Sequence, residues 1–175
     1  SVKVAASMRN AANGIRRIEA DHVLSNTPEE IKDADRRLDE ANALLEKRVE
    51  AYKEFISEPE ERAAFTEFNK SKAAYMAQQG KVIVESSKGE AGFEAAKAIF
   101  RGASRETFNA MVGDIAKIVE INDEFSKKSS ANGDATYSSA RITVLLLIST
   151  ALAMAVVLVI VILRNVTGLL GGEPA

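Results

Sequence analysis

The chain of 175 residues contains no cysteine, no tryptophan, one histidine and three prolines. Without cysteine it has no disulfide, zinc–thiolate site or thiol nucleophile, and a single histidine removes most catalytic and metal-binding histidine sites. We therefore expect no enzyme, no metal site and no cofactor. An excess of positive charge is also lacking, because 23 Lys and Arg residues face 25 Asp and Glu residues. A nucleic-acid-binding protein needs a basic surface that releases counterions, so we expect no nucleic-acid partner.

Charged residues are missing altogether from residues 142–163, which read ITVLLLISTALAMAVVLVIVIL. As a helix this stretch would span about 33 Å, enough to cross the hydrocarbon core of a bilayer. Arg141 and Arg164 flank it. The alternative is a buried core helix, but such helices are usually shorter. We predict a transmembrane helix over residues 141–164, which lies too far from the N-terminus to be a signal peptide.

Two segments have the sequence of a helix N-terminus. Thr27-Pro28-Glu29-Glu30 offers an N-cap threonine, a proline in the first turn and a glutamate three residues after the cap. Residues 57–60 (Ser-Glu-Pro-Glu) repeat this pattern. Between the two segments lies a heptad pattern of apolar residues, with charged residues on the other faces. Its members are Ile31, Leu38, Leu45 and Tyr52, together with Ala34, Ala41 and Phe55.

Three further segments show the helical spacing of apolar residues. They are residues 1–26, with Met8, Ile15 and His22; residues 59–86, with Phe65, Phe68, Tyr75, Met76, Val82 and Ile83; and residues 104–125, with Phe108, Met111, Ile115, Ile118 and Phe125. A short helical piece over residues 93–100 precedes the last segment, and Gly102 breaks it. Residues 129–134 either form a loop or continue the last helix. We favour the continuous helix, although its Asn-Gly pair disfavours helix by about 1 kcal/mol.

No segment shows the period-two alternation of a β-strand. Four long amphipathic helices with short connections must pack with their neighbours antiparallel. We therefore predict an all-α fold, an antiparallel up-down four-helix bundle whose last helix continues into a transmembrane helix. The predicted domains are the bundle (1–140), the transmembrane helix (141–164) and a terminal segment (165–175).

The residues that follow the bundle form a distinctive series. They are the run Tyr137-Ser138-Ser139-Ala140-Arg141, the hydrophobic span, and residues 164–175 with the sequence RNVTGLLGGEPA. This series resembles the input half of bacterial methyl-accepting chemotaxis receptors that have a four-helix-bundle sensor domain. Residues 165–175 are similar to the start of a HAMP signalling module, although Gly168 stands where the commoner pattern has proline.

The resemblance implies a chemotaxis transducer of the bacterial inner membrane, with residues 1–140 as a periplasmic ligand-sensing domain. It also implies a transmembrane helix before Ser1. Beyond Ala175 it implies the rest of HAMP and a cytoplasmic hairpin that engages a kinase and an adaptor protein. Charge alone does not fix the orientation, because three basic residues precede the span (Lys127, Lys128 and Arg141) and Arg164 follows it.

Arginines of the first helical segment are candidates for binding an anionic ligand. Arg9 and Arg16 are one heptad apart and project from the same side, and Arg17 adds a third guanidinium. Asn10 and Asn13 supply neutral donors nearby. Arginine suits this role because its planar guanidinium binds a carboxylate through two parallel hydrogen bonds.

The resemblance adds a hydroxyl to this site. Aspartate-type receptors of the family bind a carboxylate with arginines of the first helix and a hydroxyl near the start of the fourth. That hydroxyl corresponds by position to Ser104, with Thr107 as its neighbour. The predicted ligand is a small organic acid: an amino acid or a di- or tricarboxylate. In the alternative interpretation the arginines are solvated flanking charges, with Glu19 and Asp21 as ordinary helix neighbours of Arg16 and Arg17.

We also expect a homodimer with parallel two-fold packing. Alanines along the first segment allow two helices to approach closely, namely Ala5, Ala6, Ala11, Ala12 and Ala20. Two other functions stay open: the input domain of a membrane histidine kinase or another HAMP-containing transducer, and a membrane-anchored coiled coil without a ligand. The sequence after residue 175 would distinguish the two transducers. The coiled coil predicts that no small molecule stabilises the bundle.

Overall fold

The computed structural model describes residues 2–170, without the side chains at positions 134, 135 and 166–170. These residues form the helices α1 (Val2–Leu24), α2 (Pro28–Lys53), α3 (Pro59–Ser86), α4 (Phe93–Ile99) and α5 (Arg105–Leu170). A 3₁₀ turn, η1 (Gly89–Gly92), precedes α4, and a π-helical turn, η2 (Phe100–Ser104), joins α4 to α5. The described residues contain no strand, so the predicted all-α fold is confirmed.

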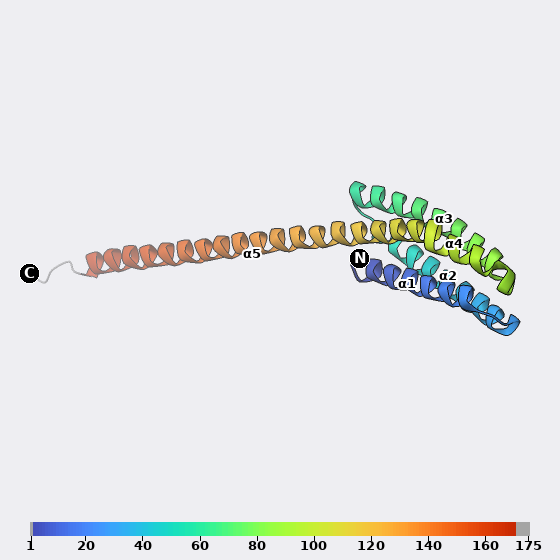
Figure 1. Ribbon diagram of the computed structural model, residues 1–175. Helices are drawn as coiled ribbons and strands as arrows, with labels where there is room; N and C mark the ends of the chain where they lie inside the picture. Colours follow the sequence, from blue (N-terminus) through green and yellow to red (C-terminus); the bar gives the residue numbers. More distant parts are fainter. Residues whose placement is uncertain (1, 171–175) are drawn as a thin grey trace, which may run out of the picture. The chain divides into compact units, whose positions relative to one another are not determined.

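The chain divides into two units, Ser1–Phe125 and Ser126–Ala175. In the first unit α1, α2 and α3 lie beside a fourth helical segment, which we call the fourth arm of the bundle (Figure 1). It consists of α4, η2 and the first part of α5. Short connections at residues 25–27, 54–58 and 87–92 reverse the direction of the chain, so successive helices run antiparallel. The predicted four-helix bundle is therefore confirmed for this unit.

The helices α2 and α3 begin differently, although the sequence predicted the same N-terminal pattern for both. At α2 the Thr27 hydroxyl accepts the Glu30 N–H at 3.2 Å, and the Glu30 carboxylate accepts the Thr27 N–H at 3.1 Å, which makes a complete capping box. At α3 the N-cap residue is Glu58, and its side chain makes no capping bond. The predicted Ser57 cap is therefore wrong, whereas the predicted proline in the first turn, Pro59, is confirmed.

The core of the bundle consists largely of the predicted apolar stripes. Its fully buried side chains include Met8 and Ile15 of α1, Leu45 and Tyr52 of α2, Phe68 and Tyr75 of α3, and Met111, Ile115 and Ile118 of α5. Two predicted members are wrong, because Phe55 is 45% exposed and Phe125 is 41% exposed. Each stands three residues beyond the last fully packed position of its segment, Tyr52 and Asn122. The core therefore ends one turn earlier than the apolar pattern predicts.

Glycines shape the return from α3 to α5. Gly89 has a φ of 65°, in the left-handed region that glycine adopts without strain. At Gly92 an added Cβ would lie 1.8 Å from the Glu85 carbonyl oxygen, so the turn can close against α3 only with glycine. Gly102 has the non-helical angles φ −96° and ψ −109°, which confirms the predicted break. This break places Phe100 and Ser104 against α1.

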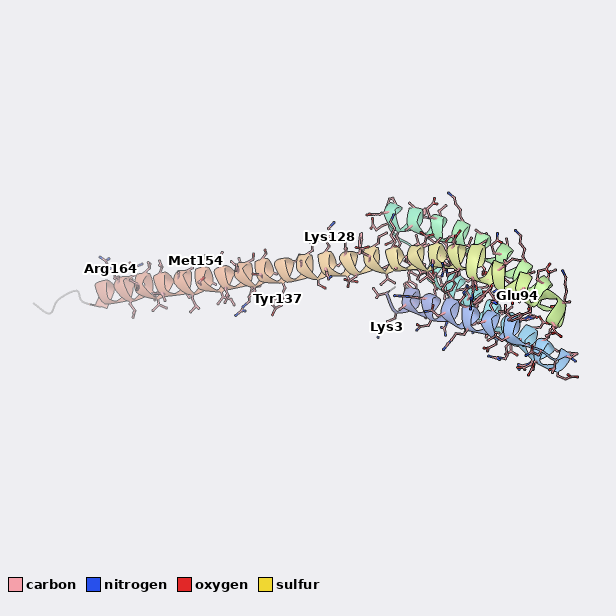
Figure 2. The ribbon with its side chains drawn as sticks, in the orientation of Figure 1. Lys3, Glu94, Lys128, Tyr137, Met154 and Arg164 are labelled. Carbon is pink, nitrogen blue, oxygen red and sulfur yellow. The ribbon has the colours of Figure 1, made fainter. Side chains whose placement is uncertain are left out.

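In the second unit the described side chains up to residue 165 are exposed on every side of α5. Figure 2 shows them standing out around the helix from Lys128 through Tyr137 to Met154. A window of this helix has a mean hydropathy of 3.1, so the helix is long and apolar enough to cross a membrane. Residues 129–134 are helical, as we favoured. The domain boundaries at 140 and 164 stay predictions, and the end of the predicted HAMP segment, residues 171–175, lies outside the described residues.

Candidate functional site

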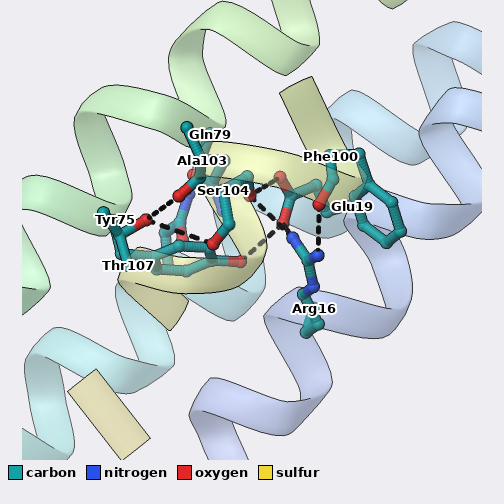
Figure 3. Close-up of polar contacts among 9 residues, drawn as sticks. Arg16, Glu19, Tyr75, Gln79, Phe100, Ala103, Ser104 and Thr107 are labelled. Atoms are coloured by element: carbon teal, nitrogen blue, oxygen red, sulfur yellow. Dashed lines mark hydrogen bonds and ion pairs between the residues drawn. The ribbon is translucent and has the colours of Figure 1, made fainter. Parts of the chain in front are cut away.

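A buried polar cluster lies between α1, α3 and η2. It consists of Arg16, Glu19, Tyr75 and Ser104, and we call it the Arg16 cluster (Figure 3). Oε2 of Glu19 accepts hydrogen bonds from Arg16 Nη1 at 2.9 Å and from the Tyr75 hydroxyl at 2.7 Å. Oε1 of Glu19 accepts from the Ser104 hydroxyl at 2.8 Å, and the same hydroxyl accepts from Arg16 Nη1 at 2.6 Å. One carboxylate therefore ties three elements of the bundle together.

Arg16 also binds the π-helical turn directly. Its Nη2 donates to the Phe100 carbonyl oxygen at 2.7 Å, and its guanidinium carbon lies 3.7 Å from the centre of the Phe100 ring. This stacked position is a favourable cation–π arrangement. The contact links α1 to the point at which the fourth arm of the bundle is broken.

Burial determines the electrostatics of the Arg16 cluster. Glu19, Tyr75 and Ser104 are fully buried, whereas the Arg16 side chain is 15% exposed. Burial, followed by the negative charge of Glu19, raises the pKa of Tyr75 far above its usual value, so this hydroxyl stays a neutral donor. An unpaired carboxylate at such a position would be strongly unfavourable, and Arg16 supplies the compensating charge. The cluster is thus satisfied by groups of the protein itself.

A groove of about 590 Å³ opens beside this cluster, and we call it the α1 groove. Its lining residues are Asn10, Asn13, Arg16, Arg17, Ala20, Phe100 and Phe108. Exposed polar side chains of α1 form one side, and the two partly buried aromatic rings form the other. The volume is in the range of small-molecule sites, which typically combine apolar walls with a few polar groups.

The five predicted ligand-binding residues are not equivalent in the structure. Arg16 and Ser104 are in contact, but both are bonded to the protein's own Glu19. Arg17 is exposed and lines the α1 groove. Arg9 is exposed and is not among the residues that line the groove. Thr107 donates its hydroxyl to backbone carbonyls of the preceding turn, so it stabilises its own helix.

The alternative interpretation treats the arginines as solvated charges; Arg9 and Arg17 are exposed, whereas Arg16 is largely buried. Arg16 pairs with the fully buried Glu19 across one turn of α1. Asp21 pairs instead with Arg37 of α2, at 2.8 Å. No hydrogen bond or ion pair engages the Arg17 side chain in the described part of the chain. Arg17 is therefore the guanidinium of the α1 groove that no other described group engages.

Sequence reasoning missed the buried carboxylate at the centre of the cluster. Glu19 was considered only as a helix neighbour of Arg16, although it lies seven residues after Ala12 and fourteen after Ala5. Both alanines are buried, so Glu19 continues a column of core positions along α1. A charged residue at a core position indicates a buried pair, and this register was the signal available in the sequence.

A second buried polar cluster lies at the end of the bundle that holds the α2–α3 turn. It consists of Tyr52, Glu61 and Asn122, and we call it the Asn122 cluster. Asn122 Nδ2 donates to the Tyr52 hydroxyl at 2.6 Å and to Glu61 Oε1 at 3.0 Å, and the Tyr52 hydroxyl donates to Glu61. Oε2 of Glu61 accepts the Ser57 N–H at 3.1 Å. Burial, and then the hydrogen bond to Glu61, raise the pKa of Tyr52 far above its usual value.

A third cluster joins α1, α2 and α3 through His22. Its Nε2 lies 3.0 Å from Asp35 Oδ1, and its Nδ1 lies 2.8 Å from the Ser86 hydroxyl. Serine, histidine and aspartate also form hydrolytic triads, but here His22 and Ser86 are buried, so a substrate could reach the hydroxyl only if the helices separated. Within the described residues, no group of three or more His, Asp or Glu side chains is arranged to hold a metal ion.

Comparison with known proteins agrees with this architecture. The family model described as a four helix bundle sensory module for signal transduction matches residues 1–137. No curated protein matches the chain, and no solved structure does. The match covers the whole packed unit and most of the chain, and α5 supplies a helix that is able to cross a membrane. The chain belongs to the family of four-helix-bundle sensory modules of methyl-accepting chemotaxis proteins.

Proposed function

We propose that residues 1–140 are the periplasmic ligand-sensing domain of a chemotaxis transducer of the bacterial inner membrane. In this proposal a small organic acid binds in the α1 groove, and the signal passes through the transmembrane helix, residues 141–164, to a HAMP module that starts at residue 165. The kinase and the adaptor protein would act on the cytoplasmic part of the transducer. The role requires ligand binding and no bond chemistry.

The observation that carries the proposal is the guanidinium of Arg17 in the α1 groove, which no group in the described part of the chain pairs with. The groove offers this charge together with the amides of Asn10 and Asn13, beside the aromatic rings of Phe100 and Phe108. Positions 10, 13 and 17 share one face of α1, because residues three, four and seven apart are neighbours on a helix surface. A guanidinium with nearby amide donors is suited to a carboxylate.

The groove also borders residues through which ligand binding could change the position of the fourth arm of the bundle relative to α1. Arg16 and Phe100 line the groove, and Arg16 holds the broken segment of the fourth arm at the Phe100 carbonyl oxygen. A ligand that prefers one arrangement of α1 and η2 shifts the population toward that arrangement. Typical allosteric coupling needs a preference of only about 1–3 kcal/mol.

A binding measurement on the full chain in lipid nanodiscs tests the proposed site. We expect at least one organic acid from a panel of mono-, di- and tricarboxylates and amino acids to raise the melting temperature of the bundle. Arg17→Ala should abolish this shift, whereas Arg9→Ala, which removes an exposed arginine outside the groove, should leave it unchanged. An acid that stabilises the wild type and both variants equally would overturn the assignment of the site.

A chimera tests the proposed output. The chain would be joined after residue 175 to the remainder of HAMP and the cytoplasmic part of a chemotaxis receptor, and kinase activity would be measured with and without the stabilising acid. We expect the acid to change kinase activity in the wild-type chimera and not in the Arg17→Ala chimera. An acid that binds the groove without any change in kinase activity would overturn the proposed signal transfer.

We further propose that the domain works as a parallel homodimer through α1. Ala5, Ala11 and Ala12 pack inside the bundle and are not available for a partner. Ala6, Asn13 and Ala20 recur every seven residues along α1; Ala6 and Asn13 are exposed and Ala20 is half-buried. Asn13 and Ala20 also line the α1 groove, so in this dimer the groove borders the interface. Such a column permits close approach of a second α1 around a two-fold axis.

Cysteine cross-linking tests this dimer without background, because the chain has no cysteine of its own. Single cysteines at positions 6, 13 and 20 should form symmetric disulfides in membranes. Ala43→Cys places the same thiol on the exposed face of α2 and should not cross-link. Failure at all three α1 positions, or equal cross-linking at position 43, would contradict the α1 interface.

A further inference from the structure

We propose that the α1 groove selects organic acids that carry one carboxylate and an apolar body of about the size of a ring, in preference to di- and tricarboxylates. This inference rests on the proposed function and narrows the class of its ligand. It follows from how the charges and the apolar surface of the groove are distributed.

The positive charge of Arg16 is already committed to the protein. Glu19 is fully buried and pairs with Arg16 at 2.9 Å, so the two charges compensate each other. Both hydrogens of Nη1 are used, on Glu19 and Ser104, and Nη2 donates to the Phe100 carbonyl oxygen. A ligand carboxylate that recruited Arg16 would leave Glu19 buried without its partner, which is strongly unfavourable. Arg16 therefore lines the groove but is poorly suited to bind a second anionic group.

Arg17 is then the single charge that a ligand can use. The other lining residues that carry polar groups are Asn10 and Asn13, which are neutral, and no carboxylate lines the groove. One guanidinium compensates one carboxylate, and two neutral amides can complete its hydrogen bonds. A second carboxylate in the groove would lose hydration without gaining an opposite charge, which is unfavourable.

The rest of the groove is apolar and aromatic. Phe100 presents its ring beneath the Arg16 guanidinium, and Phe108 packs edge-on against Tyr75 with ring centres 5.4 Å apart. Both rings are partly exposed and line the groove, together with Ala20. Burying an apolar body against these surfaces is favourable because it removes apolar area from water. A ligand with a ring beside its carboxylate would use both halves of the groove.

Four matched probes separate these contributions in binding measurements on the full chain in nanodiscs. Phenylacetate has one carboxylate and a ring, acetate lacks the ring, succinate has a second carboxylate in place of the ring, and phenylacetamide lacks the charge. We expect phenylacetate to bind at least about tenfold more tightly than each of the other three probes. Its affinity should fall about tenfold or more in Arg17→Ala and also in Phe108→Leu.

Two variants serve as matched controls. Arg9→Ala removes an exposed arginine of the same helix, and Phe55→Leu changes an exposed phenylalanine at a position that does not line the groove. Both should bind phenylacetate as the wild type does. Melting curves of all variants establish that each one is folded before its affinity is interpreted.

The outcomes distinguish this inference from the proposed function. If succinate binds more tightly than phenylacetate and Arg17→Ala abolishes its binding, the proposed acid site stands and the selection for a ring is overturned. If phenylacetate binds equally well to Arg17→Ala and Phe108→Leu, it binds elsewhere and the inference is overturned. If no acid of the panel binds, the proposed site fails, and the inference fails with it.

Discussion

Glu19 of α1 and Glu61 of α3 are both buried carboxylates, but the bundle stabilises them in different ways. Glu19 has a cationic partner in Arg16, which is partly exposed and lines a groove. Glu61 has no ion pair in the described part of the chain and is held by the donors of Tyr52, Asn122 and the Ser57 backbone. Glu19 is therefore balanced by an opposite charge that lines the groove, whereas Glu61 is balanced by neutral donors inside the bundle. Removing one partner should therefore destabilise the bundle more at Glu19, where it strands a charge, than at Glu61.

The largest expected effect comes from removing the cation of the first cluster. Arg16→Ala leaves Glu19 buried without its opposite charge, so we expect it to lower the free energy of unfolding by about 3–5 kcal/mol. Arg9→Ala, at an exposed position of the same helix, should change it by less than about 0.5 kcal/mol. Urea unfolding of the full chain in nanodiscs, followed by circular dichroism, measures both.

A second substitution separates the lost charge from lost packing. Adding Glu19→Gln to Arg16→Ala removes the stranded charge while keeping an oxygen that accepts from Tyr75. We expect the double variant to be more stable than Arg16→Ala alone, because neighbouring substitutions in one network are not additive. A double variant that is less stable would show that charge compensation is not the role of Arg16.

The next largest effect is expected in the second cluster. Asn122→Ala removes one neutral donor from Glu61 and from the Tyr52 hydroxyl, but it strands no opposite charge. We expect Asn122→Ala to lower the free energy of unfolding by about 1–3 kcal/mol, which is less than the decrease expected for Arg16→Ala. The matched control is Asn109→Ala, which changes an exposed asparagine of the same helix. A loss equal to that of Arg16→Ala would remove the distinction between the two clusters.

The sequence predicted the fold well because the fold depends on a repeating apolar period and on helix ends. The residues of the Met8–Ile15–His22 stripe are all buried, and the breaks at Pro59 and Gly102 occur where the sequence indicates them. Such signals are local, so they can be detected without knowledge of the partner helices.

The candidate site could be predicted only in part, because it depends on which polar residues face inward together. Glu61 lies seven residues before Phe68, and Asn122 lies seven after Ile115, so both continue apolar columns, as Glu19 does. That register indicates burial, but it does not identify the donors on the facing helices. Nor does it indicate that Arg16 turns toward Glu19 while Arg17, one position on, stays exposed. The pairing of positions far apart in sequence therefore required the structure.

The two tyrosines offer a comparison of the clusters at high pH. The folded bundle holds the pKa of Tyr52 and of Tyr75 above the usual value of 10.0, chiefly through burial. As the pH rises, the unfolded chain loses its tyrosine hydroxyl protons before the folded chain does. The contribution of these two tyrosines to the free energy of unfolding is therefore fully present below about pH 10 and declines as the pH rises above it. Each buried tyrosine should contribute a slope of up to about 1.4 kcal/mol per pH unit in this range.

Single substitutions show how much each tyrosine contributes to the pH dependence of the free energy of unfolding. Tyr52→Phe and Tyr75→Phe should each remove one tyrosine's share of the loss of stability between pH 10 and pH 11, as followed by urea unfolding. Tyr137→Phe changes a tyrosine that is 73% exposed and should leave the slope unchanged. If only one of the two buried tyrosines affects the slope, the clusters differ in how well they exclude water. If neither does, the neutral hydroxyl is not what stabilises the carboxylates.

The smallest effect is expected at Glu30, which occupies the same N3 position in α2 that Glu61 occupies in α3. Glu30 is exposed, and hydrogen bonds from the backbone N–H groups of Asn26 and Thr27 lower its pKa below the usual value of 4.5. Because the folded pKa is the lower one, the stabilisation is present above pH 4.5 and is lost as the pH falls through the folded value. The Thr27 amide resonance should titrate with a midpoint below 4.5, and Glu30→Gln should abolish this titration. A midpoint at or above 4.5 would mean that the capping bond does not favour the carboxylate. Glu30 and Glu61 would then differ in their burial alone, and not in how hydrogen bonds stabilise their carboxylates.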